Sequence, residues 1–114
     1  MLEKELEIEK KDFYKDFFDF QIDKNFKEGE EHVYLMYNTR NDLIKIGQSK
    51  HPNSREKTLQ SEEPEIVLLA MWQAPKSVEK ELHKKFSSKR KRGEWFHLSF
   101  NDLEKIKTRM SEYL

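Results

Sequence analysis

The chain contains no cysteine, only three glycines and three prolines, and no long hydrophobic run. The absence of cysteine excludes a disulfide framework, a thiolate zinc site and a cysteine nucleophile. No apolar stretch approaches the roughly 18 residues that a membrane-spanning helix needs, and the first residues lack the apolar segment of a signal peptide. We therefore expect a cytoplasmic protein.

Charged residues dominate what is present. Of 114 residues, 39% are charged and 35% hydrophobic, and the formal net charge is zero, which predicts one domain with a modest core. The charge is unevenly distributed. Residues 1–31 carry 11 Asp or Glu and 6 Lys or Arg, whereas residues 32–114 carry 11 Asp or Glu and 16 Lys or Arg. An acidic leader thus precedes a basic body, and a basic body favours a nucleic-acid partner.

The leader, residues 1–22, has the spacing of an amphipathic helix. Its apolar face is expected to contain Leu2, Leu6, Phe13, Phe17, Phe20 and Ile22. The aromatic side chains between positions 13 and 20 are too apolar to remain in water, so the helix should pack on the body or on a second subunit in a homodimer. A lid over a basic groove is a third alternative. We divide the chain into an acidic helix and linker, residues 1–31, and a domain, residues 32–114.

The pattern of residues 32–114 predicts a small α/β (α+β) domain. Residues 33–38 and 43–48 predict a β-hairpin, and a short helix over 54–60 follows it. The apolar run 66–72 predicts a fully buried strand near the centre of the sheet. A helix over 76–88, a short strand over 94–98 and a final helix to residue 113 complete the pattern. We expect a three-stranded, mainly antiparallel sheet flanked by helices.

Basic residues gather at the end of the helix predicted over 76–88. Between positions 76 and 92 there are eight basic and two acidic residues. The cluster consists of Lys84, Lys85, Lys89, Arg90, Lys91 and Arg92. Such a cluster predicts salt-sensitive contacts to DNA phosphates, although a solvated basic face is the common alternative.

The order of these segments resembles the GIY-YIG nuclease superfamily, in particular the branch of T5orf172 and MUG113-type domains. The first motif is similar to Val33-Tyr34-Leu35, and the second to Lys45-Ile46-Gly47, with lysine where the superfamily name has tyrosine. The family arginine falls on Arg55 and the family glutamate on Glu79. Gly93-Glu94-Trp95-Phe96 is similar to a closing motif of this branch. The resemblance covers about residues 32–107.

The resemblance implies a DNA endonuclease that hydrolyses phosphodiester bonds with Mg²⁺ or Mn²⁺. Arg55 would stabilise charge on the phosphoryl oxygens, and Glu79 would hold the metal. Tyr34 would handle the attacking water. A phenol ionises only near pH 10, so it would need a neighbouring cation such as Lys45.

These residues also have purely structural interpretations. Tyr34 could be an ordinary half-buried strand residue, and Glu79 could pair with nearby charges. His83 could hydrogen-bond within the site or bridge two helices. A non-cleaving DNA-binding module with the same fold is the alternative function, since a compact domain has little means of choosing where to cut.

Overall fold

The computed structural model describes residues 2–114, and the side-chain environments of all of these except residues 2–9, Asp23, Asn53 and Leu59. The expected apolar contacts of Leu2 and Leu6 lie outside those described. The helices and strands are α1 (Leu2–Phe18), α2 (Ile22–Asn25), β1 (His32–Asn38), β2 (Leu43–Ser49), α3 (Pro52–Glu62), β3 (Ile66–Gln73), α4 (Lys76–Lys85), β4 (Arg90–Arg92), β5 (Trp95–Phe96) and α5 (Phe100–Met110), with 3₁₀ turns η1 (Ser87–Lys89) and η2 (Ser111–Tyr113). None of the helices in residues 2–114 is both long and apolar enough to cross a membrane.

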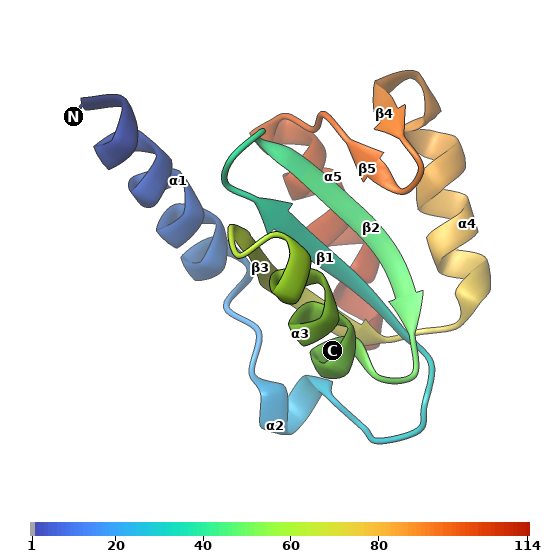
Figure 1. Ribbon diagram of the computed structural model, residues 1–114. Helices are drawn as coiled ribbons and strands as arrows, with labels where there is room; N and C mark the ends of the chain where they lie inside the picture. Colours follow the sequence, from blue (N-terminus) through green and yellow to red (C-terminus); the bar gives the residue numbers. More distant parts are fainter. Residues whose placement is uncertain (1) are drawn as a thin grey trace.

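A five-stranded antiparallel sheet in the order β3-β1-β2-β5-β4 forms the centre of the molecule (Figure 1). The predicted hairpin is confirmed, with Val33 paired to Gln48 and Asn38 to Leu43. The prediction of three strands was too low. The strand β4 is a short, wholly exposed run of basic residues, so it lacks the apolar alternation by which a strand is recognised. The α+β class is confirmed.

Helices cover both faces of this sheet. Side chains of α1, α4 and α5 share one core with alternate strand residues such as Val33, Leu35 and Ile46. The opposite face carries a smaller cluster that includes Tyr34 and Met36, and α3 contacts β3, β1 and β2. The two faces follow from the period-2 alternation of the hairpin. Tyr34 and Leu35 therefore face opposite sides, as the sequence predicts.

The helix α1 packs against the body of its own chain. It ends at Phe18, four residues before the predicted end, and Asp19 adopts a left-handed φ of 44°. Tyr14 and Phe18 are buried in the main core, whereas Phe13 and Ile22 are 53% and 47% exposed. The prediction that Phe13 and Ile22 lie on the buried face was wrong. Phe17 and Phe20 are partly buried against the core, as expected.

Replacing Phe18 with alanine should lower the free energy of unfolding by about 3 kcal/mol, because the lost ring leaves a cavity in the core. The Phe18 ring packs edge-on against Trp72, with centroids 5.9 Å apart. Urea denaturation followed by circular dichroism measures the change. Phe13→Ala on the same helix is the matched control and should cost far less. Equal losses for the two variants would contradict this packing of α1.

The strand β3 lies at the edge of the sheet, so the prediction that it is central was wrong. Side chains from the neighbouring helices occupy its outward backbone groups. The Leu68 amide donates to Glu56, and Gln60 donates to the carbonyl of Ile66, at 2.5 and 2.7 Å. Asn25 donates to the carbonyl of Met71 at 3.1 Å. The apolar run is buried because helices cover it, and not because strands flank it on both sides.

Candidate functional site

The hairpin brings Tyr34 beside Lys45 and Gly47 on the α3 face of the sheet. Tyr34 pairs with Gly47 across the two strands, and its side chain is buried. A Cβ atom added at Gly47 would lie 2.3 Å from Cζ and 2.4 Å from the hydroxyl oxygen of Tyr34. Only glycine leaves room for the tyrosine ring to lie over the backbone of β2 at this point.

Arg55, in the first turn of α3, lies near Tyr34 and Lys45. Pro52 begins this helix, as its fixed φ favours, and Arg55 is exposed on it. The guanidinium interacts with the phenol of Tyr34, lowering its pKa, and also opposes the charge of Lys45. The hairpin and the following helix thus bring Tyr34, Lys45 and Arg55 into one electrostatic neighbourhood.

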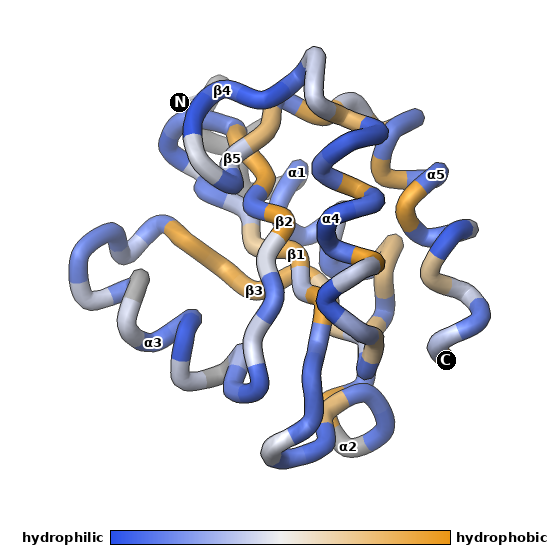
Figure 2. The backbone as a smooth tube through the Cα atoms, turned by 90° about the vertical axis from the view of Figure 1, so that its right-hand side faces the viewer, coloured by the Kyte–Doolittle hydropathy of each residue, from blue (hydrophilic) through white to orange (hydrophobic). Residues whose placement is uncertain are grey.

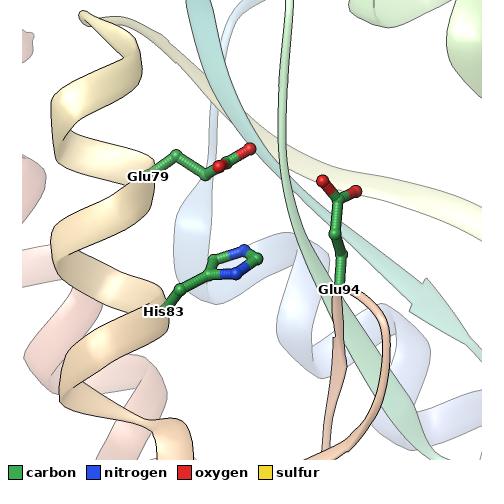
Figure 3. A group of neighbouring side chains, drawn as sticks. All are labelled: Glu79, His83 and Glu94. Atoms are coloured by element: carbon green, nitrogen blue, oxygen red, sulfur yellow. The ribbon is translucent and has the colours of Figure 1, made fainter.

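The helix α4 and the β4–β5 turn supply the other half of the site. Figure 3 shows Glu79 and His83 projecting from α4 toward Glu94, which lies just before β5. One potential ligand atom from each residue lies within 4.8 Å of the others. Glu79 is only 8% exposed, and its carboxylate has no hydrogen bond or ion pair with the other residues that the structure describes. A carboxylate without a hydrogen-bond partner among the described residues, on a side chain that is mostly buried, is suited to a cation.

The charge of Glu94 acts on Tyr34, Lys45 and Glu79. Burial and the Glu94 charge together raise the pKa of Tyr34 to about 12, against the opposing effect of Arg55. Burial and Glu94 also raise the pKa of Glu79. Burial lowers the pKa of Lys45, although Glu94 partly opposes that change. The shift of Tyr34 is opposite to the one expected from a neighbouring lysine, so at neutral pH in this structure Tyr34 is a protonated phenol.

His83 joins α4 to β2. Its Nε2 lies 2.8 Å from the carbonyl oxygen of Ile46, and a carbonyl only accepts, so Nε2 carries the proton. Its Nδ1 then accepts from the Arg90 guanidinium at 3.3 Å. The ring also meets Phe96 edge-on at 5.0 Å. The interpretation that His83 bridges two helices was wrong, because its partners Ile46, Arg90 and Phe96 all lie on strands.

The basic cluster does not form one surface. Arg90 is directed toward His83 and lies over Phe96. Lys89 forms an ion pair with Asp102 at 2.5 Å. Lys85 lines a cleft between α4 and α5, away from β2. The remaining members are Lys84, Lys91 and Arg92, and all three are exposed. None of them forms an ion pair with a side chain that the structure describes.

Lys89 has a structural role in this arrangement. Asp102 and Ser99 form a capping box at the start of α5, and Lys89 bonds the same carboxylate. Burial tends to raise the pKa of Asp102, but the bonds from Lys89 and Ser99 outweigh it and lower the pKa. Six basic residues were predicted to contact DNA, and Lys89 is the one most occupied elsewhere.

Asp102→Asn should therefore destabilise the protein by about 1 kcal/mol at neutral pH. A carboxyl with a lowered pKa in the folded state contributes stability above its unfolded pKa of about 4, and that contribution is lost as the pH falls through the folded value. Urea unfolding at pH 7 and near pH 2 checks this. The difference between wild type and variant should be present at pH 7 and shrink at pH 2; a constant difference would contradict it.

Glu94 is the site residue that the sequence analysis did not select. The signal was available, because Glu94 is the acidic member of the Gly93–Phe96 motif. Gly93 turns the chain with a left-handed φ of 51°, and the backbone carbonyl of Glu94 accepts from the amide of Ile46. The helix α4 carries Glu81 as well as Glu79. Glu81 bonds Arg109 on α5, and that bond lowers the pKa of Glu81.

Comparison with known proteins gives one family. A sequence model of the T5orf172 domain matches residues 31–111. No curated protein matches the chain, and no solved structure does. The match covers the hairpin, α3, α4 and the β4–β5 turn, and so includes every residue described in the site.

Proposed function

Because this chain belongs to the T5orf172 domain family, which is associated with GIY-YIG-like nuclease domains, we propose that it is a metal-dependent DNA endonuclease. The observation that carries the proposal is the convergence of Tyr34, Lys45, Arg55 and Glu79 from four separate elements. The charges of Arg55 and Glu79 both act on Tyr34 and on Lys45. Such a set has little structural purpose, since most of its members are buried at a cost in free energy.

Arg55 is placed to receive the phosphate. It is the exposed member of the set, so an incoming phosphodiester would meet its guanidinium first. The planar fork offers two parallel hydrogen bonds to phosphoryl oxygens. Because negative charge grows on those oxygens as water attacks, Arg55 stabilises the transition state more than the bound substrate.

Glu79 is the residue that fits a divalent cation. Its side chain is mostly buried, and its carboxylate has no hydrogen-bond partner among the described residues, which leaves its oxygens available as the hard ligands that Mg²⁺ or Mn²⁺ prefers. When bound, Mg²⁺ would polarise the phosphoryl group and acidify its own water ligands. The exposed Lys84, Lys91 and Arg92 would hold the DNA backbone.

Tyr34 acts as a hydrogen-bonding group in this proposal. With a pKa of about 12, it keeps its proton at neutral pH and can orient a water molecule by donating or accepting. The ring is fixed over Gly47, and Arg55 interacts with its hydroxyl. Tyr34 would therefore position the attacking water and would not act as a phenolate base.

Supercoiled plasmid provides the test. The wild-type protein should convert it to nicked or linear DNA in Mg²⁺ but not in EDTA, and binding should weaken as salt rises. Arg55→Ala should cut about 100-fold more slowly, as expected for the loss of one transition-state donor. Lys57→Ala, an exposed cation on the same helix, is the control and should cut normally.

Two outcomes would count against this function. A folded wild-type protein that binds DNA but cuts none in Mg²⁺ or Mn²⁺ would favour the non-cleaving binding module. Failure to bind any nucleic acid at low salt would exclude both functions. Light scattering decides the homodimer: α1 packs on its own chain, and we propose a monomer in solution.

A further inference from the structure

We propose that the ammonium of Lys45 competes with a divalent cation for the carboxylate of Glu94, and that Glu94 becomes the second carboxylate ligand, beside Glu79, when the cation displaces Lys45. The inference rests on the proposed function for the presence of a metal at Glu79. It adds a second protein ligand, and it makes cation binding the event that releases Lys45.

The two carboxylates are held closer together than their charges favour. Potential ligand atoms of Glu79 and Glu94 lie within 4.8 Å, and the carboxylates face each other across the gap (Figure 3). Glu79 is more than nine-tenths buried, is directed into this gap, and forms no hydrogen bond or ion pair with the described part of the chain. Burial and the charge of Glu94 raise the pKa of Glu79. Two carboxylates so placed need positive charge between or beside them.

Lys45 supplies that charge incompletely. Its side chain is only 6% exposed, and its Nζ lies 3.5 Å from Oε2 of Glu94. A charge-assisted hydrogen bond between these groups would normally measure about 2.7–2.9 Å, so this contact is loose. The ammonium also lies about 6.0 Å from the centre of the Trp95 ring, and burial lowers its pKa. A buried lysine with one distant anion is a replaceable partner.

The ligand set consists of oxygens. His83 uses Nε2–H for the carbonyl of Ile46, and its Nδ1 accepts from Arg90, so neither ring nitrogen is free while these bonds last. Glu79 and Glu94 remain, and two carboxylates completed by water and a phosphate oxygen suit Mg²⁺ or Mn²⁺ better than Zn²⁺.

Displacement gives Lys45 a role that it cannot perform while bound to Glu94. Once Glu94 turns to the cation, the ammonium has lost its only ion-pair partner within the described residues. It lies beside Arg55 and Tyr34, where a substrate phosphate would supply the missing negative charge. The ammonium is therefore available to the phosphate only after the cation has bound, which orders the assembly of the site as metal first and DNA second.

Isothermal titration with Mn²⁺ and the full chain, without DNA, measures the competition directly. Lys45→Met removes the competing charge and should tighten Mn²⁺ binding by about tenfold. Glu94→Gln should weaken it by a similar factor. Lys80→Met is the matched control, because Lys80 also acts on the charge of Glu79 but does not contact Glu94, and it should change the affinity far less.

Melting curves show whether each variant folds, and Lys45→Gln replaces the methionine variant if that one does not. The inference is overturned if Lys45→Met and Lys80→Met change Mn²⁺ affinity equally. It is also overturned if Glu94→Gln binds as wild type, or if the wild type binds no Mn²⁺ at millimolar concentrations. These results are independent of cutting. A site that shows the predicted competition but cuts no DNA would refute the endonuclease and leave the exchange of Lys45 intact.

Discussion

Glu79→Gln should lower the rate of plasmid cutting by at least about 10³-fold, which corresponds to about 4 kcal/mol of transition-state free energy. The substitution keeps the shape of the side chain and removes the charge that would hold the metal. It should not destabilise the fold, since Glu79 is mostly buried and its carboxylate has no hydrogen bond to lose with the described residues. DNA binding in EDTA should remain unchanged.

Glu81→Gln is the matched control for that experiment. Glu81 lies two residues further along α4 and points to the opposite side, where it bonds Arg109. This variant should lose a small amount of stability and retain its cutting rate. Comparable cutting by Glu79→Gln and Glu81→Gln would refute a metal site at Glu79.

Gly47→Ala should disrupt stability and cutting together. The new Cβ would lie 2.3 Å from Cζ of the buried Tyr34 ring, so the ring must leave its position or the strands must separate. Overpacking of this kind costs about 1–3 kcal/mol. Displacing a hydrogen-bonding group by an ångström or more should lower cutting by roughly 10²–10³-fold. Urea unfolding and single-turnover cutting measure the two effects.

A double variant separates the two effects. Adding Tyr34→Leu to Gly47→Ala removes the clashing atoms, so stability should recover while cutting should not. Gly29→Ala is a second control, because Gly29 has a left-handed φ of 80° and none of the described residues lies within 4 Å of the added Cβ. It should lose stability through backbone strain and keep its activity. Normal cutting by Gly47→Ala would show that the position of the Tyr34 ring does not matter.

The sequence predicted those parts of the fold that depend on local patterns. The hairpin, with its two apolar runs and polar turn, was correct to within one residue at each strand. The apolar spacing of Val78, Leu82 and Phe86 identified the buried face of α4. Both patterns arise from the periods of a strand and a helix, which a single segment contains in full.

Features set by the neighbours of a segment were not predictable in the same way. The apolar run of β3 predicts a strand near the centre of the sheet. The strand instead lies at the edge, because α1, α2 and α3 pack against it and bury its side chains. The strand β4 has no apolar pattern at all, and it exists because β5 pairs with it. Figure 2 displays the contrast, with β3 coloured as hydrophobic and β4 as hydrophilic.

The clustering of four candidate residues was predictable from the sequence, but their electrostatics were not. The motif order selected Tyr34, Lys45, Arg55 and Glu79, and they lie together. The direction of the pKa shift of Tyr34 could not be inferred, because it depends on burial and on Glu94, which follows sixty residues later in the chain. Proximity between distant segments is a property of the tertiary fold, so the motif that contains Glu94 did not by itself show which residues its charge affects.

The side chains that bond to the edge of β3 also protect the protein against self-association. A long apolar edge strand is a template for pairing with the same strand of another molecule. Here Glu56 and Gln60 occupy the backbone groups that such a partner would need. The opposite edge, β4, presents only like charges. Loss of α3 would therefore lead first to intermolecular sheet growth along β3, so aggregation during mild heating is a sensitive indicator of whether the helix that carries Arg55 remains docked.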